Sequence, residues 1–292
     1  MKKKLVSMLL VSVMAVSMTA CGAKETATTE QTTAQTEAVE TTETAATEAA
    51  EEAAAEETTE EGGVLRVGFD QEFPPMGFVG DDGEFTGFDL ELAAEAAKRM
   101  GMEVQYQPIA WDAKDMELES GTIDCIWNGF TMNGREDAYT WTDAYMDNTQ
   151  VFVVAADSGI TSLADLAGKT VEVQADSSAE AALKDMPELA ESFGTLQTTP
   201  DYNTAFMDLE MGAVDAIAMD VIVAGYQIEQ RQNNCVILDE AIASEEYGIG
   251  FKLGNEELRD KVQAALEEMA ADGTMKEISE KWFGKDVTTI GK

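Results

Sequence analysis

Apolar and polar residues follow two different periods along residues 64–292. Short apolar runs have the length of β-strands, whereas longer segments repeat apolar positions every three to four residues, as helices do. We expect strands at residues 64–69, 103–109, 123–130, 151–156, 170–174, 216–219, 236–238 and 247–253. We expect helices from residue 89 to 101 and at residues 116–120, 178–184, 203–211 and 255–271. Strands that alternate with helices predict an α/β fold, with parallel sheets covered on both faces.

The clearest helix is expected to begin at Asp89, which would cap its N-terminus. Residues 90–98 are rich in helix formers, and Gly101 is a typical helix terminator. In α/β sheets, ligands bind where strand ends meet helix N-termini, at a switch point or between two lobes. Polar residues at strand ends are therefore candidates for chemistry.

The first 21 residues have the pattern of an export signal. Three lysines at residues 2–4 precede an apolar run at residues 5–18, which is shorter than the about 20 residues that span a bilayer. The run ends in the sequence MTAC, so small residues precede Cys21. This end resembles a bacterial lipobox, after which Cys21 would become a lipidated N-terminus. An ordinary secretory signal is the alternative, and either signal predicts export.

Residues 22–63 are of low complexity. They hold twelve Glu, twelve Thr and eleven Ala, with Lys24 as the one base and Val39 as the one large aliphatic residue. Such a segment cannot bury enough apolar surface to offset the entropy lost on ordering. We therefore expect a disordered acidic tether ahead of the folded part.

The composition excludes several classes of function. The 292 residues contain 57 Asp and Glu, 19 Lys and Arg and no histidine, which gives a formal net charge of −38. Without histidine there is no Ser-His or Cys-His nucleophilic pair and no histidine-ligated zinc site. The negative charge repels phosphate backbones, so no nucleic-acid partner is expected. Cys125 and Cys235 lie in apolar runs, and we expect buried free thiols, with a disulfide as the alternative.

Several short motifs resemble a known family. The sequence GFDLEL at residues 87–92 is similar to the start of a family helix, and NGFT at residues 128–131, followed by Arg135, is similar to its segment of small residues, Thr and Arg. The C-terminal sequences DGT and KWFG also match. In this order, from about residue 65 to 284, the motifs resemble the polar amino-acid-binding family of ABC-importer solute-binding proteins.

The resemblance implies a two-lobed, periplasmic-binding-protein-like α/β fold of type II. Two crossover strands would join the lobes, and the ligand cleft would lie between them and close like a hinge. Lobe 1 would comprise residues 64–147 and 240–292, and lobe 2 residues 148–239. The family implies a monomer without metal or cofactor, lipid-anchored outside the cell membrane. It would capture a free amino acid and deliver it to the permease subunits of an ABC importer.

A free amino acid is a zwitterion, so the cleft must replace water around a carboxylate and an ammonium group. By resemblance, Arg135 would bind the carboxylate, because guanidinium presents two parallel N–H donors. Gly129 and Thr131 would add donors from the same segment. Ser177 and Ser178 would donate from lobe 2 at a helix start, with plain N-capping as the alternative.

The remaining site residues also come from the resemblance. Asp220, after the strand at residues 216–219, matches the ammonium-binding aspartate of the family, with a helix N-cap as the alternative. Phe73 and Trp111 match the aromatic residues that enclose the ligand side chain, with core packing as the alternative. Asn128 replaces a smaller residue and would reach the ligand side chain.

The identity of the ligand depends on Asp70, which matches a position that contacts the ligand side chain, with Glu72 close by. A carboxylate there favours a donor, either the amide of glutamine or the cation of lysine, arginine or ornithine. Cystine is a further alternative. Aspartate and glutamate are expected to bind poorly, because their second carboxylate would be unpaired.

Two positions depart from the family pattern. The spacing from Thr131 to Arg135 is one residue shorter than usual, and Gly134 would make the tighter turn that this requires. In lobe 2, where the family often has Lys or Gln just before the helix, the sequence is QAD at residues 174–176.

Two other classes of function use similar folds. Dehydratases and cell-wall lytic enzymes need an acid or base beside the reacting bond. Asp70, Glu72 and Asp220 are available, but with Arg135 they are better explained as ligand clamps, so we expect no enzyme. A ligand-sensing domain would need a separate receptor.

Overall fold

The computed structural model describes residues 62–232 and 234–292. The predicted signal peptide, Cys21 and residues 22–61 of the predicted tether lie outside the described residues. Within the described ranges, no helix combines the length and the apolar character that crossing a membrane requires.

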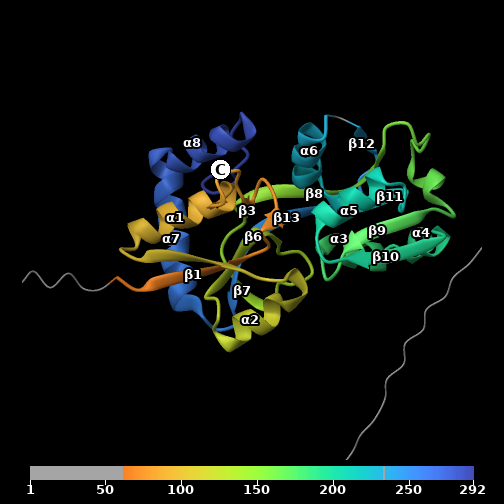
Figure 1. Ribbon diagram of the computed structural model, residues 1–292. Helices are drawn as coiled ribbons and strands as arrows, with labels where there is room; N and C mark the ends of the chain where they lie inside the picture. The colour runs from red at the N-terminus through yellow and green to blue at the C-terminus, as the bar shows by residue number, and fades with distance from the viewer. Residues whose placement is uncertain (1–61, 233) are drawn as a thin grey trace, which may run out of the picture. The chain divides into compact units, whose positions relative to one another are not determined.

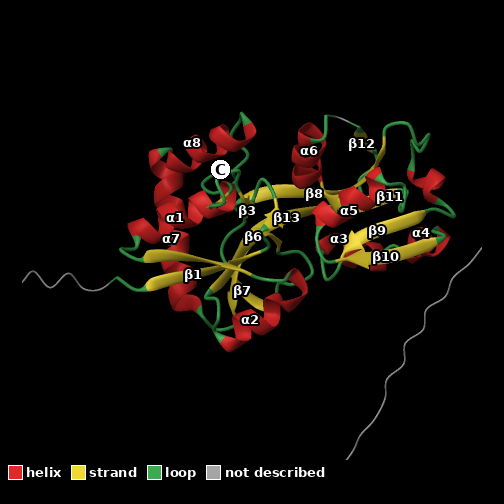
Figure 2. Cartoon of the chain, in the orientation of Figure 1, coloured by secondary structure: helices red, strands yellow, loops and turns green. Residues whose placement is uncertain are grey.

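A ten-stranded mixed sheet forms the centre of the fold (Figures 1 and 2). Its strands are β1 (Val64–Phe69), β5 (Glu103–Pro108), β6 (Cys125–Thr131), β7 (Tyr139–Trp141), β8 (Met146–Ala155), β9 (Thr170–Gln174), β10 (Thr195–Thr199), β11 (Ala216–Asp220), β12 (Cys235–Ile237) and β13 (Ala243–Lys252). The main path is β10-β9-β11-β8-β13-β6-β1-β5, with β12 on β8 and β7 on β13. A smaller sheet holds β2 (Glu72–Phe73), β3 (Gly77–Val79) and β4 (Phe85–Thr86).

Helices pack around both ends of this path (Figure 1). They are α1 (Phe88–Arg99), α2 (Lys114–Ser120), α3 (Ser178–Lys184), α4 (Pro187–Ser192), α5 (Tyr202–Glu210), α6 (Val221–Gln230), α7 (Glu256–Asp272) and α8 (Thr274–Phe283). Helices α1, α7 and α8 contact one another, whereas α5 packs against β9 and β11. The α/β architecture expected from the sequence is confirmed.

Strands β8 and β13 lie in the middle of the sheet. They pair antiparallel between residues 146–150 and 243–247. Beyond this stretch, β8 pairs with β11 and β13 pairs with β6, again antiparallel. The expected parallel pairing is found for β1 with β5 and β6 and for β9 with β10 and β11, so the sheet is mixed rather than parallel throughout. The chain leaves one group of strands through β8 and returns through β13, so these two strands run in opposite directions.

Strand β6 shows how both faces of the sheet are covered. All seven of its residues are buried. Cys125 and Trp127 pack in one apolar cluster, and Ile126 and Phe130 pack in another. Neighbouring residues of a strand point to opposite faces, so this division places a core on each side. Cys125 and Cys235 are both buried and free, as expected.

The sequence did not predict the polar first halves of β8 and β13. The sequence predicted strands from residues 151 and 247, but β8 begins at Met146 and β13 at Ala243. The added segments carry buried polar residues, Asn148, Gln150 and Glu245, which break the apolar pattern. Helices α4, α6 and α8 and strand β10 were also not predicted.

Asp89 does not cap α1, which corrects another prediction. The helix begins at Phe88, with Gly87 at the N-cap position. Asp89 is fully buried in the first turn, where its Oδ2 accepts hydrogen bonds from the Gly129 amide at 2.6 Å and the Tyr145 hydroxyl at 3.0 Å. The Asp89 carboxylate therefore accepts a hydrogen bond from β6 instead of capping the amides at the start of its own helix.

Candidate functional site

A small cavity lies where β2, β6, the segment before α2 and the loop after β6 meet β9, β11 and the start of α3. Its lining residues are Phe73, Trp111, Asn128, Gly129, Thr131, Arg135, Gln174, Ser177, Ser178 and Asp220. The structure thus brings together nine of the ten site residues predicted from the sequence. Asp70 does not line the cavity, and Gln174 does.

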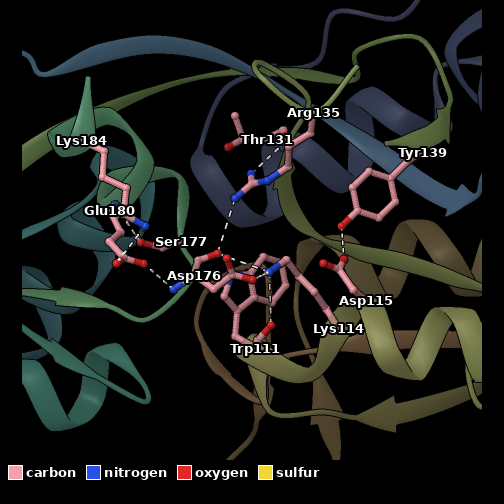
Figure 3. Close-up of polar contacts among 10 residues, drawn as sticks. All are labelled: Trp111, Lys114, Asp115, Thr131, Arg135, Tyr139, Asp176, Ser177, Glu180 and Lys184. Carbon is pink, nitrogen blue, oxygen red and sulfur yellow. Dashed lines mark hydrogen bonds and ion pairs between the residues drawn. The ribbon is translucent and has the colours of Figure 1, made fainter. Parts of the chain in front are cut away.

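Arg135 reaches the cavity from a tight turn after β6 (Figure 3). Gly134 has a φ of 78°, and the Arg135 amide donates to the Met132 carbonyl at 2.9 Å. A positive φ costs glycine little, so the shortened spacing still directs this side chain inward. The guanidinium donates to the carbonyls of Thr131 at 3.2 Å and Asp176 at 3.4 Å.

Ser177 and Ser178 face the cavity from the start of α3. The Ser177 hydroxyl accepts a hydrogen bond from the Glu180 amide at 3.1 Å, so it is also the N-cap of the helix. The Ser178 hydroxyl accepts from the Gln150 side-chain amide at 3.0 Å. Ser177 therefore performs the capping role given as the alternative and still contributes to the lining.

Asp220 ends β11 and is 3% exposed. It stands at the N-cap position of α6 but makes no capping hydrogen bond. Its Oδ1 instead accepts from the side chains of Asn148 at 2.7 Å, Gln150 at 2.7 Å and Tyr247 at 2.6 Å. Burial, and then the negative charge of Glu245, raise the pKa of Asp220 to about 7. The carboxylate is thus held toward the cavity rather than toward the helix.

Glu245 is a neighbour of this site that the sequence reasoning missed. It is 6% exposed, and its Oε1 accepts from Thr131 Oγ1 at 2.9 Å, Asn148 Nδ2 at 2.6 Å and Gln150 Nε2 at 2.7 Å. Asn148 and Gln150 are two residues apart on β8, so they lie on one face of the sheet. This i, i+2 pair of amides ahead of an apolar strand is the signal that would have revealed the cluster.

Asp70 lies behind the lining residues, after the end of β1. Its carboxylate accepts from the Gln174 side-chain amide at 2.7 Å, and its backbone amide donates to Asn128 Oδ1 at 3.0 Å. Burial raises the pKa of Asp70 to about 6. Asp70 therefore contacts two residues that line the cavity.

A buried lysine joins the two sides of the cavity, and the sequence reasoning missed it as well (Figure 3). The Lys114 side chain is 2% exposed and forms an ion pair with the Asp176 carboxylate. Its ammonium group also donates to the Trp111 carbonyl at 3.4 Å and lies 5.1 Å from the Trp111 ring centroid. Asp176 has a φ of 57°, a left-handed conformation that Asp tolerates better than most residues.

Comparisons with known proteins agree with this geometry. Residues 65–285 match the model of the bacterial extracellular solute-binding proteins, family 3. The chain is 34% identical over 232 residues to the L-cystine-binding protein TcyJ of Escherichia coli strain K12, covering 78% of this chain and 86% of that protein. It is 32% identical over 230 residues to the L-cystine-binding protein TcyA of Bacillus subtilis strain 168, covering 77% and 83%.

The solved structures include a similar fold. A substrate-binding protein of an ABC uptake transporter from Streptococcus pneumoniae, with bound histidine, superposes with a TM-score of 0.75 at 36% sequence identity. The match covers 77% of this chain and 94% of that one. The similarity thus extends over both groups of strands that border the cavity.

Proposed function

The chain belongs to the bacterial extracellular solute-binding proteins of family 3, and from this premise we propose that it captures a free amino acid outside the cytoplasm for an ABC importer. One observation carries the proposal. One small cavity is lined by one guanidinium group, Arg135, and one buried carboxylate, Asp220. These two charges complement the two charges of a zwitterion.

The lining residues divide between the parts of such a ligand. Arg135 binds the ligand carboxylate. The Gly129 amide and the Thr131 hydroxyl line the cavity, but they donate to Asp89 and Glu245. A charge-assisted hydrogen bond of this kind contributes about 1.5–3 kcal/mol. Asp220 binds the ammonium group. Phe73 and Trp111 enclose the apolar part of the side chain.

The ligand is a polar or cationic amino acid, with cystine the leading candidate. The names of TcyJ and TcyA, at 34% and 32% identity, support cystine. The family position of Asp70 favours a ligand side chain that offers hydrogen-bond donors, whereas in the structure both Asp70 oxygens accept from the Glu72 amide and the Gln174 side chain. Arginine, lysine, ornithine and glutamine share this property. Aspartate and glutamate do not, and they bind poorly.

Binding closes two lobes on the ligand. Lobe 1 comprises residues 64–147 and 240–292, lobe 2 comprises residues 148–239, and β8 and β13 are the strands that cross between them. With this division, the ion pair of Lys114 with Asp176 and the hydrogen bond from Gln174 to Asp70 each join one lobe to the other. A lipid on Cys21 and the tether at residues 22–63 hold the monomer near the permease subunits.

Calorimetric titration with L-cystine, L-arginine and L-glutamate tests this function. We expect micromolar or tighter binding of cystine or arginine, which corresponds to about −8 kcal/mol, and no measurable binding of glutamate. Arg135→Ala should abolish binding. Arg259→Ala is the matched control, because Arg259 donates to the Trp141 carbonyl at 2.6 Å and does not line the cavity. Glutamate as the tightest ligand would contradict the assignment.

The same samples test the enzymatic alternative. Asp70 and Asp220 are acids within or next to the cavity, and a dehydratase or lytic enzyme would use such a group on the reacting bond. We propose that the chain is not an enzyme, so chromatography after prolonged incubation should recover the amino acid unchanged.

A further inference from the structure

Two buried carboxylates meet beside the cavity, Asp220 from β11 and Glu245 from β13. They are 3% and 6% exposed. The same two amides bind both of them. Asn148 Nδ2 lies 2.7 Å from Asp220 Oδ1 and 2.6 Å from Glu245 Oε1, and Gln150 Nε2 lies 2.7 Å from each oxygen. The two carboxylates therefore form one cluster.

This cluster holds more negative charge than its neighbours compensate. Within residues 62–232 and 234–292, no lysine or arginine forms an ion pair with either carboxylate. Uncharged side chains on β8, β13, β6 and α3 donate hydrogen bonds to the two carboxylates. The other ionisable side chains near it on the surrounding elements are two tyrosines and one arginine, namely Tyr247, Tyr202 and Arg135. Two like charges so close together in a buried site disfavour ionisation of both groups.

The two side-chain amides that bridge the carboxylates also leave hydrogen-bond acceptors without a donor. Asn148 is 5% exposed and Gln150 is fully buried. Their nitrogen atoms are used on Asp220 and Glu245, whereas Asn148 Oδ1 and Gln150 Oε1 are buried without a hydrogen-bond partner. Buried acceptors without a donor are costly. An ammonium group brings three donors and one positive charge, so it supplies what the cluster needs.

We propose that Asp220 and Glu245 act as one binding site, which holds a shared proton in the free protein and exchanges it for the ammonium group of the ligand. The proposal rests on the function proposed above and adds Glu245 to the residues that recognise the ligand. In the free protein, one proton leaves one negative charge on the pair. On binding, the proton goes to the solvent, both carboxylates are ionised, and the ligand's ammonium group lies between the pair.

Proton exchange makes ligand affinity depend on pH. At acidic pH each binding event must displace the shared proton, so affinity should fall by up to tenfold for each pH unit. At pH values where the pair has already lost its proton, binding should release none. The rise in the pKa of Asp220 to about 7 places this change between pH 6 and 8.

Calorimetry in pairs of buffers with different heats of ionisation counts the protons. The full protein is titrated with L-cystine and with L-arginine at pH 6 and at pH 8.5. We expect about one proton released per ligand at pH 6 and close to none at pH 8.5. Glu245→Gln should reduce the release at pH 6, because it removes the negative charge of Glu245 from beside Asp220 and leaves Asp220 buried. Glu246→Gln, the exposed neighbour on β13, should leave the release unchanged.

The outcomes separate this proposal from the function on which it rests. Tight binding without proton release at pH 6, or a release that persists undiminished in Glu245→Gln, would overturn the shared site and leave amino-acid binding intact. No binding of any amino acid would overturn both. The proton count of the unmodified protein decides the question even if Glu245→Gln folds poorly.

Discussion

Single carboxylates around the cavity differ from ordinary surface carboxylates because they are buried. Desolvation raises the pKa of Asp70 to about 6 and the pKa values of Asp89 and Asp220 to about 7. Asp89 does not line the cavity itself. It fixes the Gly129 amide, which lines the cavity, and its Oδ1 is buried without a partner. The gain or loss of the Asp89 proton should therefore change the free energy of unfolding, and not only the affinity for the ligand.

Replacing Asp89 with Asn should remove one pH-dependent contribution to stability. Between about pH 4 and 7 the buried carboxyl keeps its proton in the folded state, whereas the unfolded chain has lost it. The native state then binds more protons, so the free energy of unfolding falls as the pH rises, by about 1.4 kcal/mol per pH unit for each such proton. Urea unfolding at pH 5, 6, 7 and 8 should show a shallower fall for Asp89→Asn.

The control for this measurement is Asp81→Asn, an exposed carboxylate in the turn after β3. It should keep the slope of the unmodified protein. Equal slopes for the Asp89→Asn variant and the unmodified protein would show that Asp89 is ionised in the folded state, which contradicts the account.

Residue types at strand ends were the part of the site that the sequence predicted best. Arg135 and Asp220 could be expected at one site, and both line the cavity, because family motifs and a strand end mark their positions. Glu245, Asn148 and Gln150 could not be assigned, because their role depends on the pairing of β8 with β13. Residues 97 positions apart in the chain meet there, as Asn148 and Glu245 do. A local pattern carries no information about such a pairing.

At the scale of elements, α2 and the segment before α3 are joined across the cavity. Lys114 begins α2, and its ion pair with Asp176 is supported by the contact of Arg135 with the Asp176 carbonyl. Asp176 itself is tied to α3, since its amide donates to Glu180 Oε2 at 2.8 Å. In the lobe closure proposed above, these contacts would hold the two sides of the cavity together. They should therefore affect how long the cleft stays closed.

Replacing Lys114 with Met should speed ligand release. The variant keeps the length of the apolar stem but loses the ion pair across the cleft, so we expect affinity to fall several-fold, with most of the change in the dissociation rate. Stopped-flow fluorescence can follow this rate through Trp111, which lines the cavity.

Lys184→Met serves as the comparison for this experiment. Its ammonium group lies 3.0 Å from Glu180 Oε1 in an exposed pair within α3. Such surface pairs contribute about 0–1 kcal/mol and do not cross the cleft. If both variants released ligand at the same rate, the Lys114 contact would have no role in closure.

The whole molecule follows the architecture that the sequence motifs indicated, with one clear exception. Alternation of strands and helices predicted the α/β class. It could not predict the antiparallel β8 and β13, because their central segments are polar and a hydrophobic pattern does not reveal them. The lobe boundaries rest on the family resemblance rather than on the pattern.

A thermal-shift screen against the twenty amino acids, ornithine and cystine tests the central claim most directly. A ligand at a hundred times its dissociation constant stabilises the folded state by about 2.7 kcal/mol, which corresponds to a rise in Tm of a few degrees for a domain of this size. We predict one or two clear stabilising ligands among the polar and cationic compounds, and loss of the effect in Arg135→Ala and Asp220→Ala. An unchanged Tm across the whole panel would contradict the assignment of this protein to amino-acid capture.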